Sequence, residues 1–569
     1  MRRLIRRQAD QTLPGMSPLL GRLFAARGIT DATEVDHSLS HLLPPTGLKG
    51  LQAAAELLGE AVIHNRKILI VGDFDADGAT SCALLVLGLG AMGARQVDYL
   101  VPNRFEFGYG LTPEIVDVAS TRNPALIVTV DNGISSVDGV RHARALGMDV
   151  LVTDHHLAGE TLPEANAIVN PNQPGCEFAS KHLAGVGVAF YLLSALRVAL
   201  RAANWFRLCK LPEPNLADYL DLVALGTIAD VVRLDRNNRI LVSEGIRRIR
   251  GGRASVGLLA LLEIAGRLPE EVLARDLAFA VAPRLNAAGR LEDMSLGIEC
   301  LLTDDRAKAQ EYAVRLDALN RERREIESDM KEQALAALAK AERVRGGDKT
   351  GLCLYEPDWH QGVVGIVAAR VKDRYHRPVI AFANAGGGEL KGSARSIAGF
   401  HIRDALDHIA ACNPGLVTKF GGHAMAAGLT LAADRFQDFA VAFDEEAKRQ
   451  LTPAELEHRV VSDGEPGERL TLALVREIEN AAPWGQGFEE PLFDAEFEIV
   501  DQRIVGERHL KLKVRPLDDD VTFDAIAFNQ DRLLEGRYRR LAYRPDINVY
   551  RGRSSVQLVV VATDLSPDN

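Results

Sequence analysis

The chain has 569 residues, 47% hydrophobic and 25% charged, which provides enough apolar sequence for several separate cores. With 78 acidic and 67 basic residues, its formal net charge is −11 at pH 7, so the chain is not a polycation that coats nucleic acid by bulk charge. The six cysteines are scattered without a C-x-x-C pair, which argues against a disulfide scaffold or a zinc site and fits a reducing compartment.

We expect a cytoplasmic protein that does not enter a membrane. The basic start, MRRLIRRQAD, leads into no apolar segment of the kind found in secretory signals. The most apolar stretch, residues 183–196, is shorter than the roughly 18 residues that a membrane span needs.

After a lead that closes near Pro44 and Pro45, short β-branched runs alternate with longer helical ones, which is typical of an α/β domain. Strands are predicted at residues 67–71, 125–130 and 149–153. Each is followed by polar residues, as expected of buried parallel strands.

The second half of the chain divides into three parts. Residues 304–345 are rich in Ala, Leu, Glu, Lys and Arg without Pro or Gly, which predicts a long exposed helix or helix pair that links two lobes. A smaller α/β region is predicted at 351–450, with strands at 352–355 and 378–382 and a glycine-rich segment near 421. Alternating segments at 510–514, 547–550 and 556–561 predict a small antiparallel barrel or sandwich.

Acidic residues follow all three strands of the first region. The segment KILIVGDFDADGAT (67–80) runs from a strand into Asp73, Asp75 and Asp77, which would share one face in an extended chain. The next two strands end in Asp131-Asn132-Gly133 and in Asp154-His155-His156, and a helical apolar run stops at Asp230. Because ligands bind at the carboxyl edge of open parallel sheets, these acids are expected to meet in one crevice.

Clustered carboxylates raise one another's pKa and need a cation to stay ionised together. Aspartate and histidine without cysteine favour Mn²⁺ or Mg²⁺, and two such ions about 3.5 to 4 Å apart could activate a water and neutralise a phosphoryl group. The alternative for any single acid is a loop residue or a helix N-cap. The recurrence at three strand ends favours the metal site.

The motifs GDFDADGAT, VDNG, the DHH triplet at 154–156 and LGTIADV resemble the DHH phosphoesterase superfamily. Further segments resemble the bacterial single-stranded-DNA exonucleases of that superfamily over almost the whole chain: PNRFEFGYG (102–110), APRLNAAGR (282–290), WHQGVVGIVAARV (359–371), GSARS (392–396), GGHAMAAG (421–428) and APWGQGFEEPLF (482–493).

The resemblance implies an α/β fold made of a parallel-sheet DHH domain and a smaller α/β DHH-associated domain, joined by a long helix and followed by an OB-fold barrel. The expected boundaries are 1–48 for an N-terminal lead, 49–240 for the DHH catalytic domain, 241–348 for a helical connector, 349–452 for the DHH-associated substrate-binding domain and 453–569 for the OB-fold. These parts would surround a channel for one strand. The implied activity is 5′ to 3′ digestion of single-stranded DNA to mononucleotides in repair and recombination.

The resemblance also implies residue roles. The metal ligands would be Asp75, Asp77, Asp131, His155 and Asp230. Asp154 and His156 would support the site or contact phosphate. Some superfamily members carry a histidine four residues before the first ligating aspartate, where this chain has Val71, so the ligand set of one metal ion would differ.

Arginine suits phosphate because its planar fork pairs with two oxygens. By resemblance, Arg104 with Ser393 and Arg395 would hold the terminal 5′ phosphate and set the polarity. The remaining candidate substrate contacts are Arg284, Asn286, Arg290, Gly421, Gly422 and His423. A helix after the glycines would direct its backbone amides at phosphate, although surface ion pairs or packing could also explain these residues.

The C-terminal segment is locally basic and interleaves arginines with Tyr538, Tyr543 and Tyr550, which favours stacking of bases in a cationic groove. A solvated strand face is the alternative. The arginines are Arg532, Arg537, Arg539, Arg540, Arg544, Arg551 and Arg553.

Two other functions stay open at this point: a phosphoesterase of short oligonucleotides or nucleotide phosphates, and a non-catalytic single-strand-binding scaffold. The basic C-terminal segment favours long strands over the first, and the presence of every acid favours catalysis over the second. The expected partner is single-stranded DNA, bound by a monomer. Docking of the single-stranded-DNA-binding protein SSB, the choice of ion and the DNA-versus-RNA preference are left open by the sequence.

Overall fold

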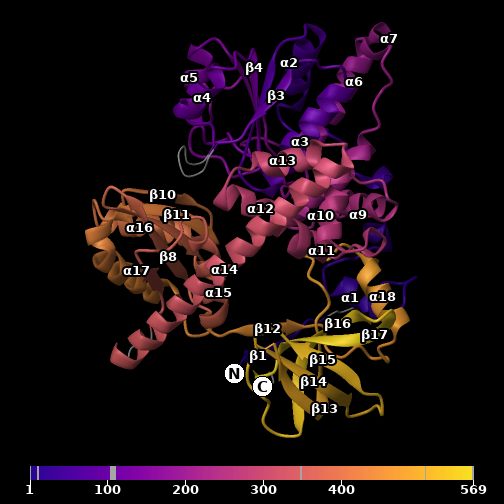
Figure 1. The fold of residues 1–569 in the computed structure, drawn as a ribbon, viewed down its shortest axis with the longest axis vertical. Coiled ribbons are helices and arrows are strands. Elements are labelled where there is room, and N and C mark those ends of the chain that lie inside the picture. The colour runs from indigo at the N-terminus through magenta and orange to yellow at the C-terminus, as the bar shows by residue number, and fades with distance from the viewer. Residues whose placement is uncertain (1, 9–11, 103–109, 346–348, 507, 567–569) are drawn as a thin grey trace.

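In the computed structural model, the described residues are 2–8, 12–102, 110–345, 349–506 and 508–566. A five-stranded parallel sheet, ordered β3-β2-β4-β5-β6, forms the core of the first lobe, at the top of Figure 1. Its strands confirm the three predicted ones and are β2 Ile68–Gly72, β3 Val97–Leu100, β4 Leu126–Val130, β5 Asp149–Thr153 and β6 Ala167–Val169.

The two faces of this sheet bury alternate side chains against different helices. Ile68 and Ile70 face the helices α2 Leu51–Ile63, α3 Ala76–Ala91 and α6 Gly185–Ala202, whereas Leu69 and Val71 face α4 Pro113–Ser120 and α5 Val137–Ala145. The chain moves outward from β2 to β3 and then returns to place β4 on the other side of β2. Ligands bind at such a switch point, between the carboxyl ends of β2 and β4.

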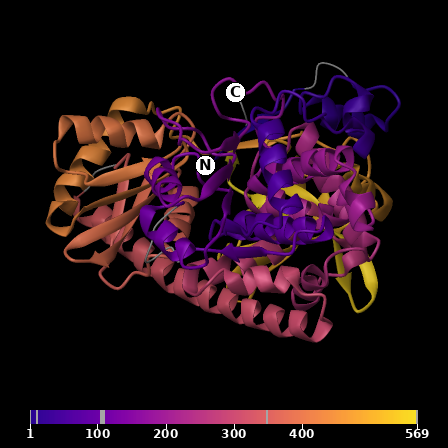
Figure 2. The ribbon, with the colours of Figure 1, turned by 90° about the horizontal axis from the view of Figure 1, so that it is seen from above.

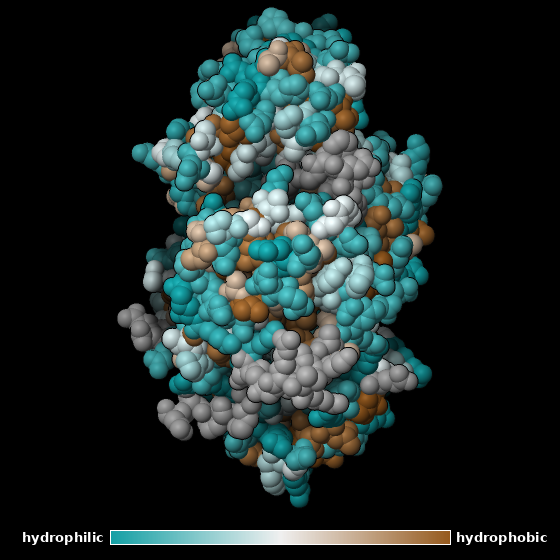
Figure 3. All heavy atoms as spheres, turned by 90° about the vertical axis from the view of Figure 1, so that its left-hand side faces the viewer, coloured by the Kyte–Doolittle hydropathy of each residue, from teal (hydrophilic) through white to brown (hydrophobic). Residues whose placement is uncertain are grey.

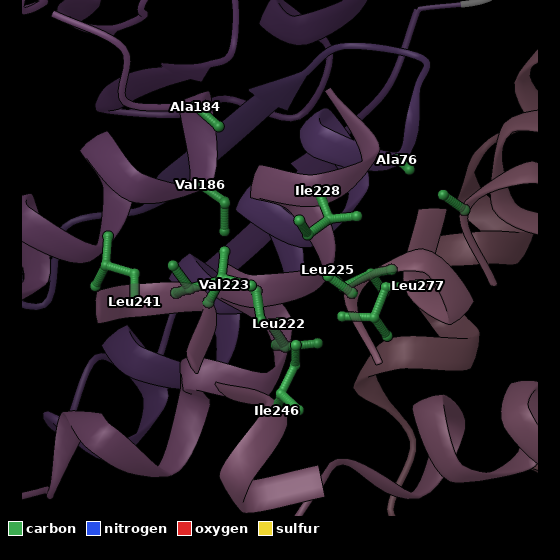
Figure 4. Packing of buried hydrophobic residues seen from close by; sticks show 14 of the residues in the cluster. Ala76, Ala184, Val186, Leu222, Val223, Leu225, Ile228, Leu241, Ile246 and Leu277 are labelled. Carbon is green, nitrogen blue, oxygen red and sulfur yellow. The ribbon is translucent and has the colours of Figure 1, made fainter. Parts of the chain in front are cut away.

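Helix α8 Leu220–Ala229 lies in the middle of the helical part of this lobe (Figure 4). Val223 and Ile228 lie near Ala76 of α3, Val186 of α6 and Leu277, all in one buried cluster. The surrounding helices are α7 Trp205–Cys209, α9 Arg236–Arg250, α10 Val256–Ile264, α11 Ala274–Asp276, the π-helix Leu277–Val281, α12 Ala282–Leu291 and α13 Ser295–Leu302.

Among the described residues, α6 is the one helix whose length and composition would allow it to cross a membrane. Of its 18 residues, 61% are buried inside the protein, where α6 packs on α2, α3 and α8. A buried core helix of this kind meets the same criteria as a membrane span.

Helix α14 Arg306–Arg345 confirms the predicted long helix at 304–345. Its 40 residues span about 60 Å at 1.5 Å per residue. Its N-terminal part packs on α10, α12 and α13, and its later part packs on α15 Val364–Tyr375 (Figure 2). The helix therefore joins the first lobe to a second one.

The second lobe is a mixed sheet ordered β10-β11-β9-β8-β7, in which only β7 and β8 are parallel. Helices α14 and α15 cover one face, and α16 Ile402–Cys412 and α17 Phe436–Gln450 cover the other. The strands are β7 Leu352–Tyr355, β8 Val379–Gly386, β9 Glu389–Arg395, β10 Lys419–Gly422 and β11 Ala426–Ala432. Hydrophilic side chains dominate the face of the molecule that Figure 3 presents, with hydrophobic ones in small patches.

The C-terminal part is a closed five-stranded barrel, which selects the barrel of the two predicted alternatives. Its order is β13-β14-β15-β17-β16, and the pair β15–β17 is parallel, so the expected all-antiparallel arrangement is wrong at this pair. The strands are β13 Phe493–Val505, β14 His509–Pro516, β15 Phe523–Ala527, β16 Tyr538–Tyr550 and β17 Arg553–Ala562, and α18 Leu472–Ala481 packs on β16 and β17.

The two ends of the chain meet at this barrel (Figure 1). Strand β1 Arg2–Arg6 lies between β12 Arg459–Ser462 and β18 Leu565–Ser566 in a parallel sheet. Phe24 of α1 Pro18–Ala25 stacks on Trp484 and Phe488. The expected domain boundaries stay a prediction, and the one between residues 240 and 241 falls inside α9.

Candidate active site

The loop after β2 carries three aspartates into the N-terminus of α3. Asp75 caps this helix, because its side chain accepts hydrogen bonds from the backbone amides of Asp77 and Gly78 at 2.9 and 3.0 Å. The two carboxylate oxygens of buried Asp77 accept from the amides of Gly185 and Val186 at the N-terminus of α6. The expected extended alternation is therefore wrong, since a helical turn brings these acids together.

Asp131 follows β4 in a strained conformation. Its φ of +60° lies in the left-handed region, which few residues other than glycine adopt and which is frequent at active sites. The start of α6 packs directly on it, since a Cβ added to Gly185 would lie 2.7 Å from the Asp131 Cβ. Buried Asn132 donates to the carbonyls of Val71 and Val130, which ties the ends of β2 and β4 together.

Asp154 follows β5 and organises the two histidines after it. Its carboxylate accepts from the backbone amides of Ile134, His155 and His156 and from His156 Nδ1 at 2.7 Å. Burial alone would raise the pKa of Asp154, but the hydrogen bond from His156 lowers it. Burial alone would lower the pKa of His156, but the same hydrogen bond raises it to about 9. The two residues form an ion pair in which Asp154 is buried and His156 is partly exposed.

His155 connects the strand ends to Asp230, the C-cap residue of α8. Its Nε2 lies 3.1 Å from Asp131 Oδ1 and 3.4 Å from Asp230 Oδ2. Burial and the charge of His156 lower the pKa of His155 to about 3, so the ring is neutral and these contacts are not ion pairs. Because the ring also hydrogen-bonds the Leu183 carbonyl, we assign that proton to Nδ1, which leaves the Nε2 lone pair facing two acids.

The ligand atoms of the centre gather in three overlapping groups, each with its atoms within 4.8 Å of one another. The groups are Asp73–Asp75–Asp131, Asp77–His155–Asp230 and Asp131–His155–His156. Burial, and next the charge of Asp75, raises the pKa of Asp77 to about 7. Burial and the charge of Asp77 also raise the pKa values of Asp131 and Asp230.

These residues fit divalent cations. Buried acids that raise one another's pKa, with an imidazole lone pair aimed at two of them, form an arrangement that a cation between them would stabilise. Carboxylates and one imidazole are the donors that Mn²⁺ and Mg²⁺ accept. Asp131 and His155 each belong to two of these groups, so the groups together offer donors for two ions.

Asp73 is the residue that sequence reasoning left out of the ligand set. It is 5% exposed and groups with Asp75 and Asp131. The Asp-x-Asp-x-Asp repeat was the available signal, but the repeat alone could not show which of its acids would face the centre.

The second lobe reaches the centre through the hairpin of β10 and β11. The ring of His423, in the turn, stacks on His156 with centroids 6.0 Å apart. Gly421 and Gly422 end β10, and β11 follows, so the helix expected after these glycines is wrong. The next strand, β9, holds Ser393 and Arg395, whose side chains hydrogen-bond each other at 3.2 Å.

Helix α12 places the other candidate substrate contacts differently. Asn286 accepts from the Ala76 amide and thereby supports the loop of Asp75. Arg290 donates to the Gly362 carbonyl of the second lobe. Arg284 is buried and pairs with Asp317 of α14 at 2.8 Å. Arg104 lies outside the described residues.

The barrel holds the basic C-terminal segment in two environments. Arg537, Arg540 and Arg544 pair with acids of the segment 490–498, and the ring of Tyr543 is 2% exposed, so the expectation that Tyr543 stacks with bases is wrong. Tyr538 and Tyr550 are 58% and 65% exposed. Arg537 and Arg551 lie over these two rings.

Sequence models of three known families match consecutive parts of the chain. They are the DHH family, N-terminal domain, at residues 67–227, the DHHA1 domain at 348–449, and the RecJ OB domain at 465–562.

Comparisons over the whole chain agree with these family matches. The single-stranded-DNA-specific exonuclease RecJ of Dickeya dadantii is 55% identical over 97% of both chains, and that of Escherichia coli is 54% identical over 98% of both. The crystal structure of Thermus thermophilus RecJ in complex with Mn²⁺ matches all of this chain and 80% of that one, with a TM-score of 0.79 at 32% identity. The Mg²⁺ complex matches with a TM-score of 0.74 at 30% identity over all of this chain and 79% of that one.

Proposed function

The chain belongs to the RecJ family of single-stranded-DNA-specific exonucleases, and we propose that the acids around Asp131 are the place where it hydrolyses the strand. The protein is a metal-dependent exodeoxyribonuclease that acts on single-stranded DNA, with Mn²⁺ or Mg²⁺ as its cofactor. The observation that carries the site is the convergence of acids that follow β2, β4 and α8 on one histidine that follows β5.

In this proposal Asp73, Asp75 and Asp131 would hold one ion, and Asp77, His155 and Asp230 would hold a second one. When bound, the ions supply positive charge to the phosphoryl group and lower the pKa of the attacking water. Asp154 keeps His156 protonated and oriented, so that its ring can donate to a phosphate oxygen.

We propose that residues of the second lobe set the polarity of digestion by binding one end of the strand. We infer that Ser393 and Arg395, together with Arg104, hold the terminal 5′ phosphate, so that mononucleotides leave from the 5′ end. Strands with a bulky 5′ or 3′ block test this, and digestion that ignores the 5′ block but stops at the 3′ block would reverse the polarity. Action as a monomer in the cytoplasm, on strands that SSB coats, belongs to the same proposal.

The Asp77→Asn substitution tests the centre. Asparagine keeps the size of the Asp77 side chain but turns its amino group toward one of the two α6 amides and removes a charge that the cation needs, so divalent-dependent cleavage should fall at least about 100-fold while strand binding persists. Release of nucleotides from an end-labelled single strand is the measurement. The matched control is Asp138→Asn, whose side chain is 76% exposed on α5 and should leave the rate unchanged. Full activity of Asp77→Asn would reject the site.

A further inference from the structure

A cationic pocket of about 300 Å³ lies in the first lobe, where segments distant in sequence meet. We call it the Arg233 pocket, and its charged or imidazole lining residues are Arg27, Lys181, His182, Arg233, Asp235 and Arg239. Four permanent positive charges thus surround one lining carboxylate in a chain whose net charge is −11. Such a local reversal of charge attracts anions.

The partners of these residues leave the pocket positive. Asp463 neutralises Arg27 at 2.9 Å, and Asp235 is engaged by Ser180 and by the amide of Asn238 as the N-cap of α9. Lys181 Nζ donates to two backbone carbonyls, which do not cancel its charge. The exposed side chain of Arg233 makes no ion pair with any residue that the structure describes.

Arg239 forms the buried floor of the pocket. It is 4% exposed and its guanidinium lies 4.3 Å from the ring centre of Phe488. One of its terminal nitrogens donates to the Leu234 carbonyl, while its buried Nε has no hydrogen-bond partner within the described part of the chain. Burial lowers the pKa of Arg239. The charges of Asp235 and Glu34 oppose this effect in part, and an anion in the pocket would offset the remaining cost of burying the cation.

The pocket adjoins the metal centre along the chain on two sides. His182 precedes Leu183, whose carbonyl holds His155, and Arg233 follows Asp230 by three residues, which span at most about 11 Å. Helix α9, which carries Arg239, lies to the right in Figure 1, whereas β10 and β11, which reach His156 through His423, lie to the left. A strand held at its 5′ end by the second lobe would therefore reach the pocket after it passes the metal centre.

We propose that the Arg233 pocket binds a backbone phosphate of the DNA strand on the 3′ side of the scissile bond. The backbone from Asp230 to Arg233 spans at most about 11 Å, which corresponds to no more than roughly three nucleotides of stacked strand, and fewer when the strand is extended. This inference rests on the proposed function, because it names a further phosphate subsite of the same strand. Arg233 acts as a positioning residue that holds the strand and does not touch the reacting atoms.

The test is a series of substitutions at this exposed residue: Arg233→Lys, Arg233→Ala and Arg233→Glu. For a long single strand, Arg233→Ala should raise KM about five- to tenfold and reduce the slope of log KM against log salt by about 0.7, because one phosphate contact is lost. Arg233→Lys should retain most of the affinity, Arg233→Glu should lose more, and kcat should stay unchanged throughout. A dinucleotide is too short to reach the pocket, so all variants should cleave it equally.

The control is Arg141→Ala, an arginine 68% exposed on α5 that pairs with its neighbour Asp138. A KM and a salt slope of Arg233→Glu equal to those of the wild-type protein would overturn the subsite. So would a short poly-aspartate peptide that binds the wild-type protein but not Arg233→Glu while strand kinetics stay unchanged, since the pocket would then serve an acidic peptide. Failure of the wild-type protein to digest any single strand would instead refute the proposed function.

Discussion

Asp154 differs from the acids around it, because its pKa is lowered where theirs are raised. Its carboxylate accepts four hydrogen bonds, three of them from backbone amides. Asparagine at this position would place an amino group against donors and release His156. We therefore expect Asp154→Asn to raise the half-saturating Mn²⁺ concentration 10- to 100-fold, roughly as for other residues that orient metal ligands.

A Mn²⁺ titration of nucleotide release measures this effect. Because Asp154 would act through the orientation of the histidines, the rate at saturating Mn²⁺ should recover at least in part, which a general loss of folding would not allow. Asp138→Asn should leave the titration unchanged. An Asp154→Asn protein with the wild-type Mn²⁺ requirement would contradict the orienting role.

At the scale of single residues, the sequence predicted which strand ends carry the acids but not how each acid faces the centre. Asp75 is both the N-cap of α3 and a member of a ligand group, so the N-cap and the metal-ligand interpretations of this acid are both correct in geometry. Asp73 was expected in the crevice but was left out of the ligand set, because its orientation depends on the turn at residues 73–75. The burial of Arg284 against Asp317 depends on α14, more than 30 residues away, and a local motif contains no information on that contact.

At the scale of elements, the approach of α8 to α3 sets the distance between Asp230 and Asp77. A Cβ added to Gly226 of α8 would lie 2.3 Å from Thr80 Oγ1 and 2.8 Å from Asp77 Oδ1. Gly226→Ala should therefore push the two helices apart. A displacement of about 1 Å at a catalytic group can cost about 100-fold in rate, so we expect a loss of that order in strand digestion.

Gly90→Ala is the matched control, because it adds the same methyl group to the same pair of helices. Gly90 is exposed on α3 and a Cβ there would meet nothing within 4 Å. It should keep full activity and gain up to about 1 kcal/mol of helix stability. The measurements are the digestion rates and the urea unfolding midpoints of both variants. A fully active Gly226→Ala protein would show that α8 can shift without loss of digestion rate.

Element types were predictable wherever the pattern was local. The strands of the first sheet and the helix α14 follow from β-branched runs and from a long stretch without Gly or Pro. The segment after Gly421 gave the wrong type because glycines permit both a helix start and a tight hairpin, and pairing of β11 with β9 selects the hairpin. The place of β1 between β12 and β18 depends on residues more than 450 positions away.

At the scale of the whole molecule, the barrel docks on the first lobe through Arg275 of α11. Its guanidinium binds Glu490 at 2.8 Å and Glu479 and Asp546 at 2.6 Å, which lie in the linker, in α18 and in β16. A cleft of about 710 Å³ between lobe and barrel lies beside this contact. Because β1 and α1 also pack on the C-terminal part, deletion of the barrel would disturb the N-terminal segment, so a point substitution is the cleaner probe.

Arg275→Ala would leave three carboxylates facing one another without their cation. Since the side chain of Arg275 is 31% exposed, we expect a cost of roughly 2 kcal/mol, less than for a fully buried network. The loss should loosen the barrel, so that KM rises for long strands that reach it and stays unchanged for dinucleotides. The surface control Arg201→Ala breaks a pair with Glu213 on a 55% exposed side chain and should change neither. An equal loss of both substrates would mean that Arg275 stabilises the first lobe itself, and that the barrel does not bind the strand through this docked position.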